Sequence, residues 1–312
     1  MKLLALLVAA CACVAHAEPF AYVPNEKSGS VSVIDIATDK VVRDIRVGGR
    51  PRGIALHDAT LYISDESSNA VLIVKDGAVR GRIALGKSPE GIALSADGRW
   101  LAAAVEEANA VALIDTSNAA VVATIPTRGK NPEHAVFSPD ARWLYVSAED
   151  ASQVDAIDVA TRKVAHSIDV GRRPRGIGFS PDGRTAYVAC ELDSTVYAID
   201  VATHSVRAKV TAGEFSNGIA VAPDGKRVYV SNGRGASVSV IDTSSHTVAA
   251  TIGVGQRPWN MALSPDGAKL YVANGRSNSV SVIDTRELKR VADIPVGELP
   301  WGVAINPRRS PG

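Results

Sequence analysis

The sequence predicts an all-β protein of the seven-bladed β-propeller class, and three observations support that prediction. One glycine-containing loop recurs along the chain, starting at Gly48, Gly86, Gly129, Gly171, Gly213, Gly255 and Gly297. The successive spacings are 38, 43, 42, 42, 42 and 42 residues, as expected for one four-stranded propeller blade per repeat. Between the loops, short runs alternate β-branched and polar residues, as half-buried strands do. No helical periodicity is sustained after residue 17.

Each repeat has the same order of predicted elements. The loop is followed by a short apolar strand such as residues 177–179, and then by a Pro-Asp-Gly turn such as residues 181–183, which suits a hairpin. A second strand resembles residues 187–189, a third alternates like residues 238–241, and a fourth resembles residues 248–254. An aspartate ends the third strand in most repeats, at Asp35, Asp115, Asp158, Asp200, Asp242 and Asp284. We expect each of these carboxylates to accept hydrogen bonds within its own turn.

The two ends of the chain predict how the ring closes. Residues 22–25 match the second strand of a repeat, as in residues 271–274, so the repeat pattern begins at a second strand. The last loop, at Gly297, is followed by one strand only, at residues 303–305. Three N-terminal strands and one C-terminal strand are therefore expected to form the last blade. Such a joint closes the ring without a covalent bond and covers sheet edges that would otherwise pair with other chains.

The first 17 residues are predicted to be a secretory signal peptide. Lys2 is their only charged residue, an apolar stretch follows it, and Ala15 and Ala17 flank His16 in a small-x-small cleavage pattern. We therefore expect a periplasmic or secreted protein.

Cleavage after Ala17 would leave residues 18–312 as one propeller domain. Lipoprotein processing at Cys11 is the alternative, because residues 8–11 resemble a lipobox. The sequence contains no other long apolar run, so no membrane span is predicted.

The composition is that of a globular protein with balanced charge. Apolar residues make up 46% of the chain and charged residues 21%. Once Lys2 is removed, the lysines and arginines equal the 33 aspartates and glutamates in number. No basic surface is indicated, and nucleic-acid binding is disfavoured. Cys190 is the one cysteine left after cleavage, so neither an internal disulfide nor a Cys-x-x-Cys-His haem attachment is predicted.

The recurring segments Tyr-Val-Ala-Asn and Val-Ser-Val-Ile-Asp, with the Ser-Pro-Asp-Gly turn, resemble the YVTN family of β-propeller repeats. The resemblance covers essentially all of residues 18–312. More narrowly, residues 25–27 followed by residues 31–35 resemble the propellers associated with pyrroloquinoline-quinone (PQQ)-dependent alcohol catabolism. That resemblance implies an accessory role in the periplasm, near quinoprotein dehydrogenases and transporters. It does not imply that this chain binds the quinone.

Two sets of side chains are predicted to meet at one mouth of the central channel, on loops held by a rigid scaffold. The set that follows the second strands consists of Glu26, Glu66, Glu106, Glu149 and Glu191, with Gly233 and Gly275 at the last two positions. The set that follows the proline position of each glycine loop consists of Arg52, Glu90, Glu133, Arg175, Asn217, Trp259 and Trp301. Such a ring would bind a polar ligand, a cation or a protein partner. Alternatively, its charges serve the structure alone, with the glutamates capping loop amides and pairing with Arg52 and Arg175.

Aromatic residues make the predicted mouth asymmetric. Trp259 and Trp301 lie in adjacent repeats, and Asn260 stands where most repeats have glycine. The tryptophans either stack on a ligand, anchor a partner protein or plug the channel. His134 also replaces a glycine, next to Glu133. It is a candidate base, metal ligand or surface residue, although a single histidine is a weak metal signal.

One motif is misleading. Residues 81–88 fit the phosphate-loop pattern G-x-x-x-x-G-K-S, but that motif binds phosphate only where the loop follows a strand and opens a helix. Here residues 82–85 are predicted to be a strand and Pro89 belongs to the next repeat loop, so we exclude this reading. The signatures G-x-S-x-G and H-E-x-x-H are absent from the sequence. No catalytic site, metal site or cofactor is predicted.

The sequence therefore favours a non-catalytic binding or scaffold protein that takes a protein partner or a small polar ligand at the channel mouth. The first alternative is an enzyme acting at that mouth, such as a lactonase-like hydrolase. Its acid–base groups would be Glu90, Glu133, His134 and Arg175. The second alternative is a haem-binding propeller, in which His134 alone is placed to be an axial ligand.

Overall fold

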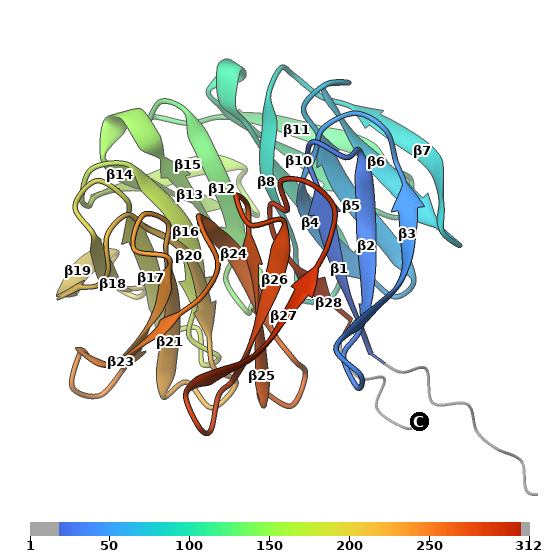
Figure 1. The fold of residues 1–312 in the computed structure, drawn as a ribbon. Helices are drawn as coiled ribbons and strands as arrows, with labels where there is room; N and C mark the ends of the chain where they lie inside the picture. Colours follow the sequence, from blue (N-terminus) through green and yellow to red (C-terminus); the bar gives the residue numbers. More distant parts are fainter. Residues whose placement is uncertain (1–18, 307–312) are drawn as a thin grey trace, which may run out of the picture.

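The computed structural model describes residues 19–306 as seven four-stranded antiparallel sheets arranged in a ring (Figure 1). The predicted all-β seven-bladed propeller is confirmed. Within this range the only helical elements are two single turns of 3-10 helix, η1 (Glu106–Ala108) and η2 (Glu149–Ala151). None of the described elements is a helix long and apolar enough to cross a membrane. The predicted signal peptide, with Cys11, and residues 307–312 lie outside the described residues.

The blades are named in chain order, and their strands are given from the channel outwards. The first blade contains β4 (Pro51–His57), β5 (Thr60–Asp65), β6 (Ala70–Lys75) and β7 (Ala78–Ala84); the second contains β8 (Pro89–Leu94), β9 (Trp100–Val105), β10 (Ala110–Asp115) and β11 (Ala120–Pro126). The third contains β12 (Pro132–Phe137), β13 (Trp143–Ala148), β14 (Gln153–Asp158) and β15 (Lys163–Asp169); the fourth contains β16 (Pro174–Phe179), β17 (Thr185–Cys190), β18 (Thr195–Asp200) and β19 (Ser205–Thr211). The fifth contains β20 (Ser216–Val221), β21 (Arg227–Asn232), β22 (Ser237–Asp242) and β23 (Thr247–Gly253); the sixth contains β24 (Pro258–Leu263), β25 (Lys269–Asn274), β26 (Ser279–Asp284) and β27 (Lys289–Pro295). The closing blade contains β28 (Ala304–Ile305), β1 (Phe20–Asn25), β2 (Ser30–Asp35) and β3 (Lys40–Arg46).

The closing blade consists of three N-terminal strands and one C-terminal strand, as predicted. β28 pairs antiparallel with β1, with Ala21 opposite Ile305, and Figure 1 shows these two strands side by side. The backbone N–H of Phe20 donates to Oδ1 of Asn306 at 2.6 Å. β28 also contacts β24 and β4, the inner strands on either side of it. The C-terminal strand therefore completes both the closing blade and the inner ring.

Apolar residues fill the space between neighbouring sheets. On one side of the closing blade, Val23 and Ile34 pack with Val282 of the sixth blade. On its other side, Val33 packs with Ile63 of the first blade. The alternation of side chains along each strand makes this possible, because successive residues face opposite neighbours. Each blade is thus stabilised by two others, and removal of one interface exposes apolar surface on both.

Glycines in the inner strands keep the central channel narrow. A Cβ on Gly53 would lie 2.6 Å from the carbonyl oxygen of Glu90, which is closer than van der Waals contact permits. The same close approach occurs at equivalent glycines of other inner strands. In the third and sixth blades this position is occupied by His134 and Asn260, and both line the channel. The two sequence exceptions therefore put polar side chains on the channel wall.

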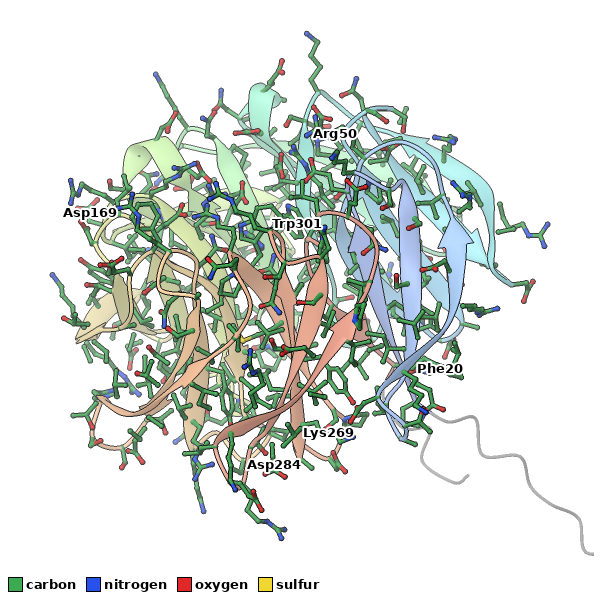
Figure 2. The ribbon with its side chains drawn as sticks, viewed as in Figure 1. Phe20, Arg50, Asp169, Lys269, Asp284 and Trp301 are labelled. Carbon is green, nitrogen blue, oxygen red and sulfur yellow. The ribbon has the colours of Figure 1, made fainter. Side chains whose placement is uncertain are left out.

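The turns separate onto two faces of the ring. The recurring aspartates accept hydrogen bonds within their own turns as predicted, for example Asp35 from the N–H of Ala37 at 2.8 Å. The loops after the second strands instead join the glycine loops: the N–H of Glu191 donates to the carbonyl oxygen of Arg173 at 2.9 Å. Figure 2 shows Arg50, from a glycine loop, and Asp284, from an aspartate turn, at opposite faces. The two predicted sets of mouth residues therefore share one face.

Candidate functional site

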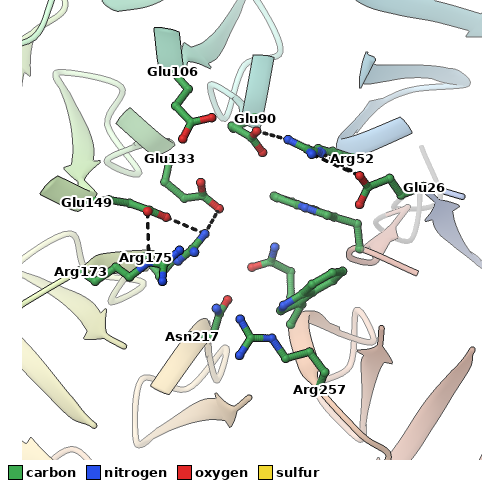
Figure 3. Close-up of a pocket in the computed structure, with 13 residues that line it drawn as sticks. Glu26, Arg52, Glu90, Glu106, Glu133, Glu149, Arg173, Arg175, Asn217 and Arg257 are labelled. Carbon is green, nitrogen blue, oxygen red and sulfur yellow. Dashed lines mark hydrogen bonds and ion pairs between the residues drawn. The ribbon is translucent and has the colours of Figure 1, made fainter. Parts of the chain in front are cut away.

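The channel opens on the glycine-loop face into a cavity of about 290 Å³, called here the mouth cavity (Figure 3). Its side chains come from the starts of the inner strands, from the loops before them and from the first residue after some of the second strands. They are Glu26, Arg52, Glu90, Glu106, Glu133, Glu149, Arg173, Arg175, Asn217, Arg257, Trp259, Asn260 and Trp301. Most of the residues expected at the mouth from the sequence are therefore brought together around one cavity.

Three residues of the predicted site do not line the mouth cavity. Glu66 pairs with Nη1 of Arg50 at 2.8 Å. Glu191 is completely buried and acts on the mouth only through the arginines that it holds. His134 lies deeper and lines a smaller channel cavity of about 140 Å³, called here the inner cavity.

Arg175 is the centre of a buried ionic cluster. Its Nη1 lies 2.6 Å from Oε1 of Glu133 and 2.6 Å from Oε1 of Glu149, and its Nε lies 3.1 Å from Oε2 of Glu191. Arg173 Nε contacts Glu149 and Glu191 at 3.1 and 3.3 Å. Burial opposes the charge on Arg175, but the surrounding carboxylates outweigh it and raise its pKa. This arginine is a fixed cation that holds three glutamates in place.

A second ionic cluster surrounds Arg52 and joins residues of the closing, first and second blades. Arg52 Nη2 lies 3.2 Å from Oε1 of Glu26, and its Nη1 pairs with Oε1 of Glu90. Arg50 also pairs with Glu26. The two clusters together form a continuous arc of glutamates and arginines along one side of the mouth cavity (Figure 3).

Between the two arginines, carboxylates crowd together. Ser88 Oγ lies 3.1 Å from Oε1 of Glu90 and 2.9 Å from Oε2 of Glu106, and one hydroxyl proton serves only one of them at a time. Burial and the charge of Glu133 raise the pKa of Glu90 to about 8. Burial and Glu133 likewise raise the pKa of Glu149 to about 7. The pKa values of Glu90 and Glu149 are therefore both raised towards neutral pH.

Glu133 itself stays ionised. Burial would raise the pKa of this carboxyl, but Arg175 beside it outweighs burial, and the pKa of Glu133 is lowered. The arc thus combines Glu133, whose pKa is lowered, with a neighbour, Glu90, whose pKa is raised. Such separation of pKa values is common at functional sites, although structural ion pairs also cause it.

The other side of the mouth cavity is aromatic and amide-bearing. Trp259 lies over Gly275, where a Cβ would come within 2.9 Å of Cζ3 of the indole. Gly233 similarly leaves room for Arg257, whose Nη1 would lie 3.1 Å from an added Cβ. The glycines that interrupt the set of glutamates therefore have a reason: the side chains of Trp259 and Arg257 occupy that space.

His134 and Trp301 stack between the two cavities. Their ring centroids lie 5.5 Å apart with an interplanar angle of 20°, and Trp301 and Asn260 line both the mouth cavity and the inner cavity. Both ring nitrogens of His134 are buried without a hydrogen-bond partner of good geometry among the described residues. Burial lowers the pKa of His134, so the ring is neutral at neutral pH.

Two lining residues were not expected from the sequence. Arg173 and Arg257 lie two positions before the predicted mouth residues Arg175 and Trp259, and each contacts Glu191. The sequence contained a clue to them, because Arg50 occupies the equivalent loop position and also pairs with mouth carboxylates.

The structure also excludes phosphate binding by residues 81–88. These residues run from β7 into the loop before β8, and no helix follows that loop.

Comparisons with known proteins agree with the propeller fold, and two family models match parts of the chain. The family model described as "Lactonase, 7-bladed beta-propeller" matches residues 160–299, and the model described as "Cytochrome D1 heme domain" matches residues 103–216. Neither match covers half of the chain. A search of curated protein sequences gave no match.

Two solved structures show the extent of the structural likeness. A chain of hydrazine synthase from Kuenenia stuttgartiensis is similar with a TM-score of 0.77 and 25% identity, over 85% of this chain and 92% of that one. A functionally unknown protein from Desulfotomaculum acetoxidans DSM 771 is similar with a TM-score of 0.82 and 17% identity, over 93% of this chain and 99% of that one. Similarity over nearly whole chains agrees with the seven-bladed propeller fold.

The haem-domain match raises the question of whether these residues fit a haem. A haem needs an apolar slot for a flat macrocycle and an axial ligand with a free nitrogen or sulfur. Here the mouth cavity is lined by charged side chains, and the His134 ring is stacked on Trp301 above a cavity of only about 140 Å³. The residues present do not fit a haem. The described residues also contain no group of three or more histidine, cysteine or acidic side chains able to hold a metal ion.

Proposed function

We propose that the chain is a binding protein whose mouth cavity takes a small polar molecule. The observation that carries this proposal is the two-sided lining of one cavity, with glutamates and three arginines on one side and Trp259, Trp301, two asparagines and Arg257 on the other. Ligand pockets combine stacking surfaces with a few converging polar groups in this way. At about 290 Å³ the cavity lies at the lower end of the roughly 300–1,000 Å³ found for drug-sized ligands, so the ligand is small.

Binding is favoured over catalysis because the acid–base candidates are held in place. Glu133 is paired with Arg175 at 2.6 Å, and its lowered pKa makes it a weak base. The ring nitrogens of His134 are buried below the mouth. A general base needs an accessible lone pair within hydrogen-bond reach of the proton that it removes.

Lactone hydrolysis is a second candidate, favoured by the lactonase model over residues 160–299 and by Glu90, whose pKa is raised and which faces the cavity. Hydrolysis of glucono-δ-lactone above the spontaneous rate, lost in Glu133→Gln, would favour this function over binding alone. Wild-type protein that leaves the spontaneous rate unchanged would argue against it.

A ligand of the mouth cavity is expected to stabilise the folded protein through Trp259. We predict that at least one compound among simple monosaccharides, amino acids and alkylammonium salts raises the midpoint of thermal unfolding by at least about 5 °C at a hundredfold excess over its Kd. Trp259→Ala should abolish that shift, because it removes one wall of the cavity. The matched control is Trp100→Ala, since Trp100 begins β9 and does not line the cavity. A shift retained in Trp259→Ala would place the ligand elsewhere.

We further propose that the chain is exported and serves as an accessory protein near a quinoprotein dehydrogenase. The signal-like residues 1–17 and the resemblance to YVTN and PQQ-associated propellers support this proposal. A pull-down from periplasmic extract, probed for the dehydrogenase, tests it. Recovery of the chain only from the cytosol would contradict export.

A further inference from the structure

The mouth cavity contains more carboxylates than cations to balance them. Five glutamates and four arginines line it. Three of those arginines also donate to the buried Glu191, at 3.3 Å from Arg173, 3.1 Å from Arg175 and 2.9 Å from Arg257. The arginines are therefore already paired by the protein itself. A ligand that brings a positive charge would gain more here than an anion.

Glu106 is the mouth carboxylate that lacks a cationic partner among the described residues. Its nearest polar partner is the hydroxyl of Ser88 at 2.9 Å, and among the described residues it has no ion pair with lysine or arginine. Glu90 lies on β8 of the same blade and Glu133 on β12 of the next, and Figure 3 shows the three carboxylates close together. All three line the mouth cavity.

A second observation points to a ligand on the opposite side. Asn217 is only 3% exposed and lines the cavity, yet its side chain has no hydrogen-bond partner among residues 19–306. Figure 3 shows its amide directed into the cavity. The amide is therefore open to the cavity and available to a ligand or its hydration water as a hydrogen-bond partner.

The tryptophans indicate which kind of cation fits. Trp259 and Trp301 both line the cavity, and the face of an indole attracts ammonium groups, quaternary ones included. A bare metal ion gains little from aromatic faces, and the described residues lack a group suited to hold one. The combination of carboxylates and indoles favours an organic cation.

We propose that the mouth cavity takes a small organic ammonium ion, with its charge beside Glu90, Glu106 and Glu133 and its apolar groups against Trp259 and Trp301. This inference rests on the proposed binding function and specifies its ligand class. Binding is coupled to a proton: the carboxyl of Glu90 releases its proton to solvent as the ligand cation takes the place of that proton in the charge balance.

The coupling sets the direction of the pH dependence. Glu90 faces Arg52 from the first blade, Glu106 from η1 and Glu133 from the third blade. Below its pKa of about 8 the ligand must displace a proton, and above it the carboxylate is already free. Affinity for the cation therefore rises with pH through this range, and it rises also as Glu149 ionises near pH 7.

Calorimetric titration with three probes of similar size tests the charge preference. Tetramethylammonium is the permanent cation, tert-butanol the neutral analogue and pivalate the anion, all at one ionic strength. We expect tetramethylammonium to bind at least about tenfold more tightly than either analogue, a difference of about 1.4 kcal/mol. Two buffers of different ionisation enthalpy at neutral pH should reveal proton release on binding.

A pair of adjacent glutamates supplies the matched variants. Glu106→Gln should weaken tetramethylammonium binding about fivefold or more, because it removes the carboxylate that has no arginine partner. Glu107→Gln should leave binding unchanged, since Glu107 is exposed, pairs with Lys87 and does not line the cavity. Unchanged midpoints of unfolding in both variants would show that the fold is intact.

Different failures have different meanings. If tert-butanol or pivalate binds as tightly as the cation, or if Glu106→Gln binds normally, the charge preference is wrong and the binding function stands. If none of the three probes binds and no compound stabilises the protein through Trp259, both the inference and the proposed function are wrong.

Discussion

Deletion of residues 300–312 is expected to lower the midpoint of thermal unfolding by about 10 °C or more. The deletion removes β28, which is the inner strand of the closing blade. It also removes the hydrogen bond from the N–H of Trp301 to the carbonyl oxygen of Pro24 at 3.0 Å and the buried side chain of Val303. Loss of these contacts and exposure of the β1 edge should cost several kcal/mol. Circular dichroism during heating measures the change.

A circular permutant distinguishes the effect of losing strand β28 from the effect of changing where the chain ends. Because the N–H of Phe20 reaches the side chain of Asn306 at 2.6 Å, a short glycine–serine linker can join residue 306 to residue 20. A chain that starts at residue 300, passes through this linker and ends at residue 299 retains every strand. We expect it to unfold within a few degrees of the unpermuted chain. If the deletion mutant melts as the full chain does, the joint contributes nothing to stability.

Arg175→Met is expected to lower the free energy of unfolding by about 3–5 kcal/mol at pH 8, because it leaves the buried carboxylate of Glu133 without its ion pair and takes one cation from Glu149 and Glu191. Glu133, Glu149 and Glu191 all contact the guanidinium within 3.1 Å. The arginine side chain is 13% exposed, so water replaces it poorly. Urea denaturation of wild type and variant gives the difference directly.

The loss should depend on pH with a definite sign. In the wild type, Arg175 holds the pKa of Glu133 below its usual value, which stabilises the fold above the unfolded-state pKa of about 4.3. In the variant the same carboxyl is buried without a cation, so its pKa rises above the unfolded value and the fold loses stability as pH rises. The difference between wild type and variant should therefore be largest near pH 8 and small near pH 4.

The control for this prediction is Arg172→Gln. Arg172 comes from the same loop and pairs with Asp193 at 2.7 Å, but its side chain is 68% exposed. Exposed pairs contribute about 0–1 kcal/mol, so this variant should unfold almost as the wild type does at every pH. A large effect at Arg172, or a pH-independent effect at Arg175, would contradict the account of the buried cluster.

The fold was predictable from sequence because every repeat contains the short-range signals that specify one blade. The glycine loop, the Pro-Asp-Gly turn and the alternating strands each act within a few residues, and their repetition makes errors visible. The joint between β1 and β28 was predictable for the same reason: the unmatched strands at the two ends have complementary places in one blade. The gathering at one mouth of the residues that follow the proline position, such as Arg52 and Trp259, followed from that topology.

The partners of the mouth residues were not predictable from repeat position alone. Glu66 and Glu106 have equivalent positions, yet Glu66 pairs with Arg50, whereas Glu106 meets Ser88 at the same place in the loop that leads into its own blade. The identity of one loop residue thus decides whether a glutamate is paired by an arginine or left free of one. The stacking of His134 on Trp301 depends on side-chain directions across the channel, which no local pattern encodes.

The central claim is that a small organic cation binds in the mouth cavity, between the glutamate arc and the tryptophans. A crystal soaked with tetramethylarsonium, the heavier analogue of tetramethylammonium, tests this claim most directly, because arsenic scatters anomalously. We predict an arsenic peak within the mouth cavity, bordered by Glu106 and Trp259. Absence of that peak at a concentration that saturates binding in solution, or a peak only on the outer surface of the blades, would contradict the claim.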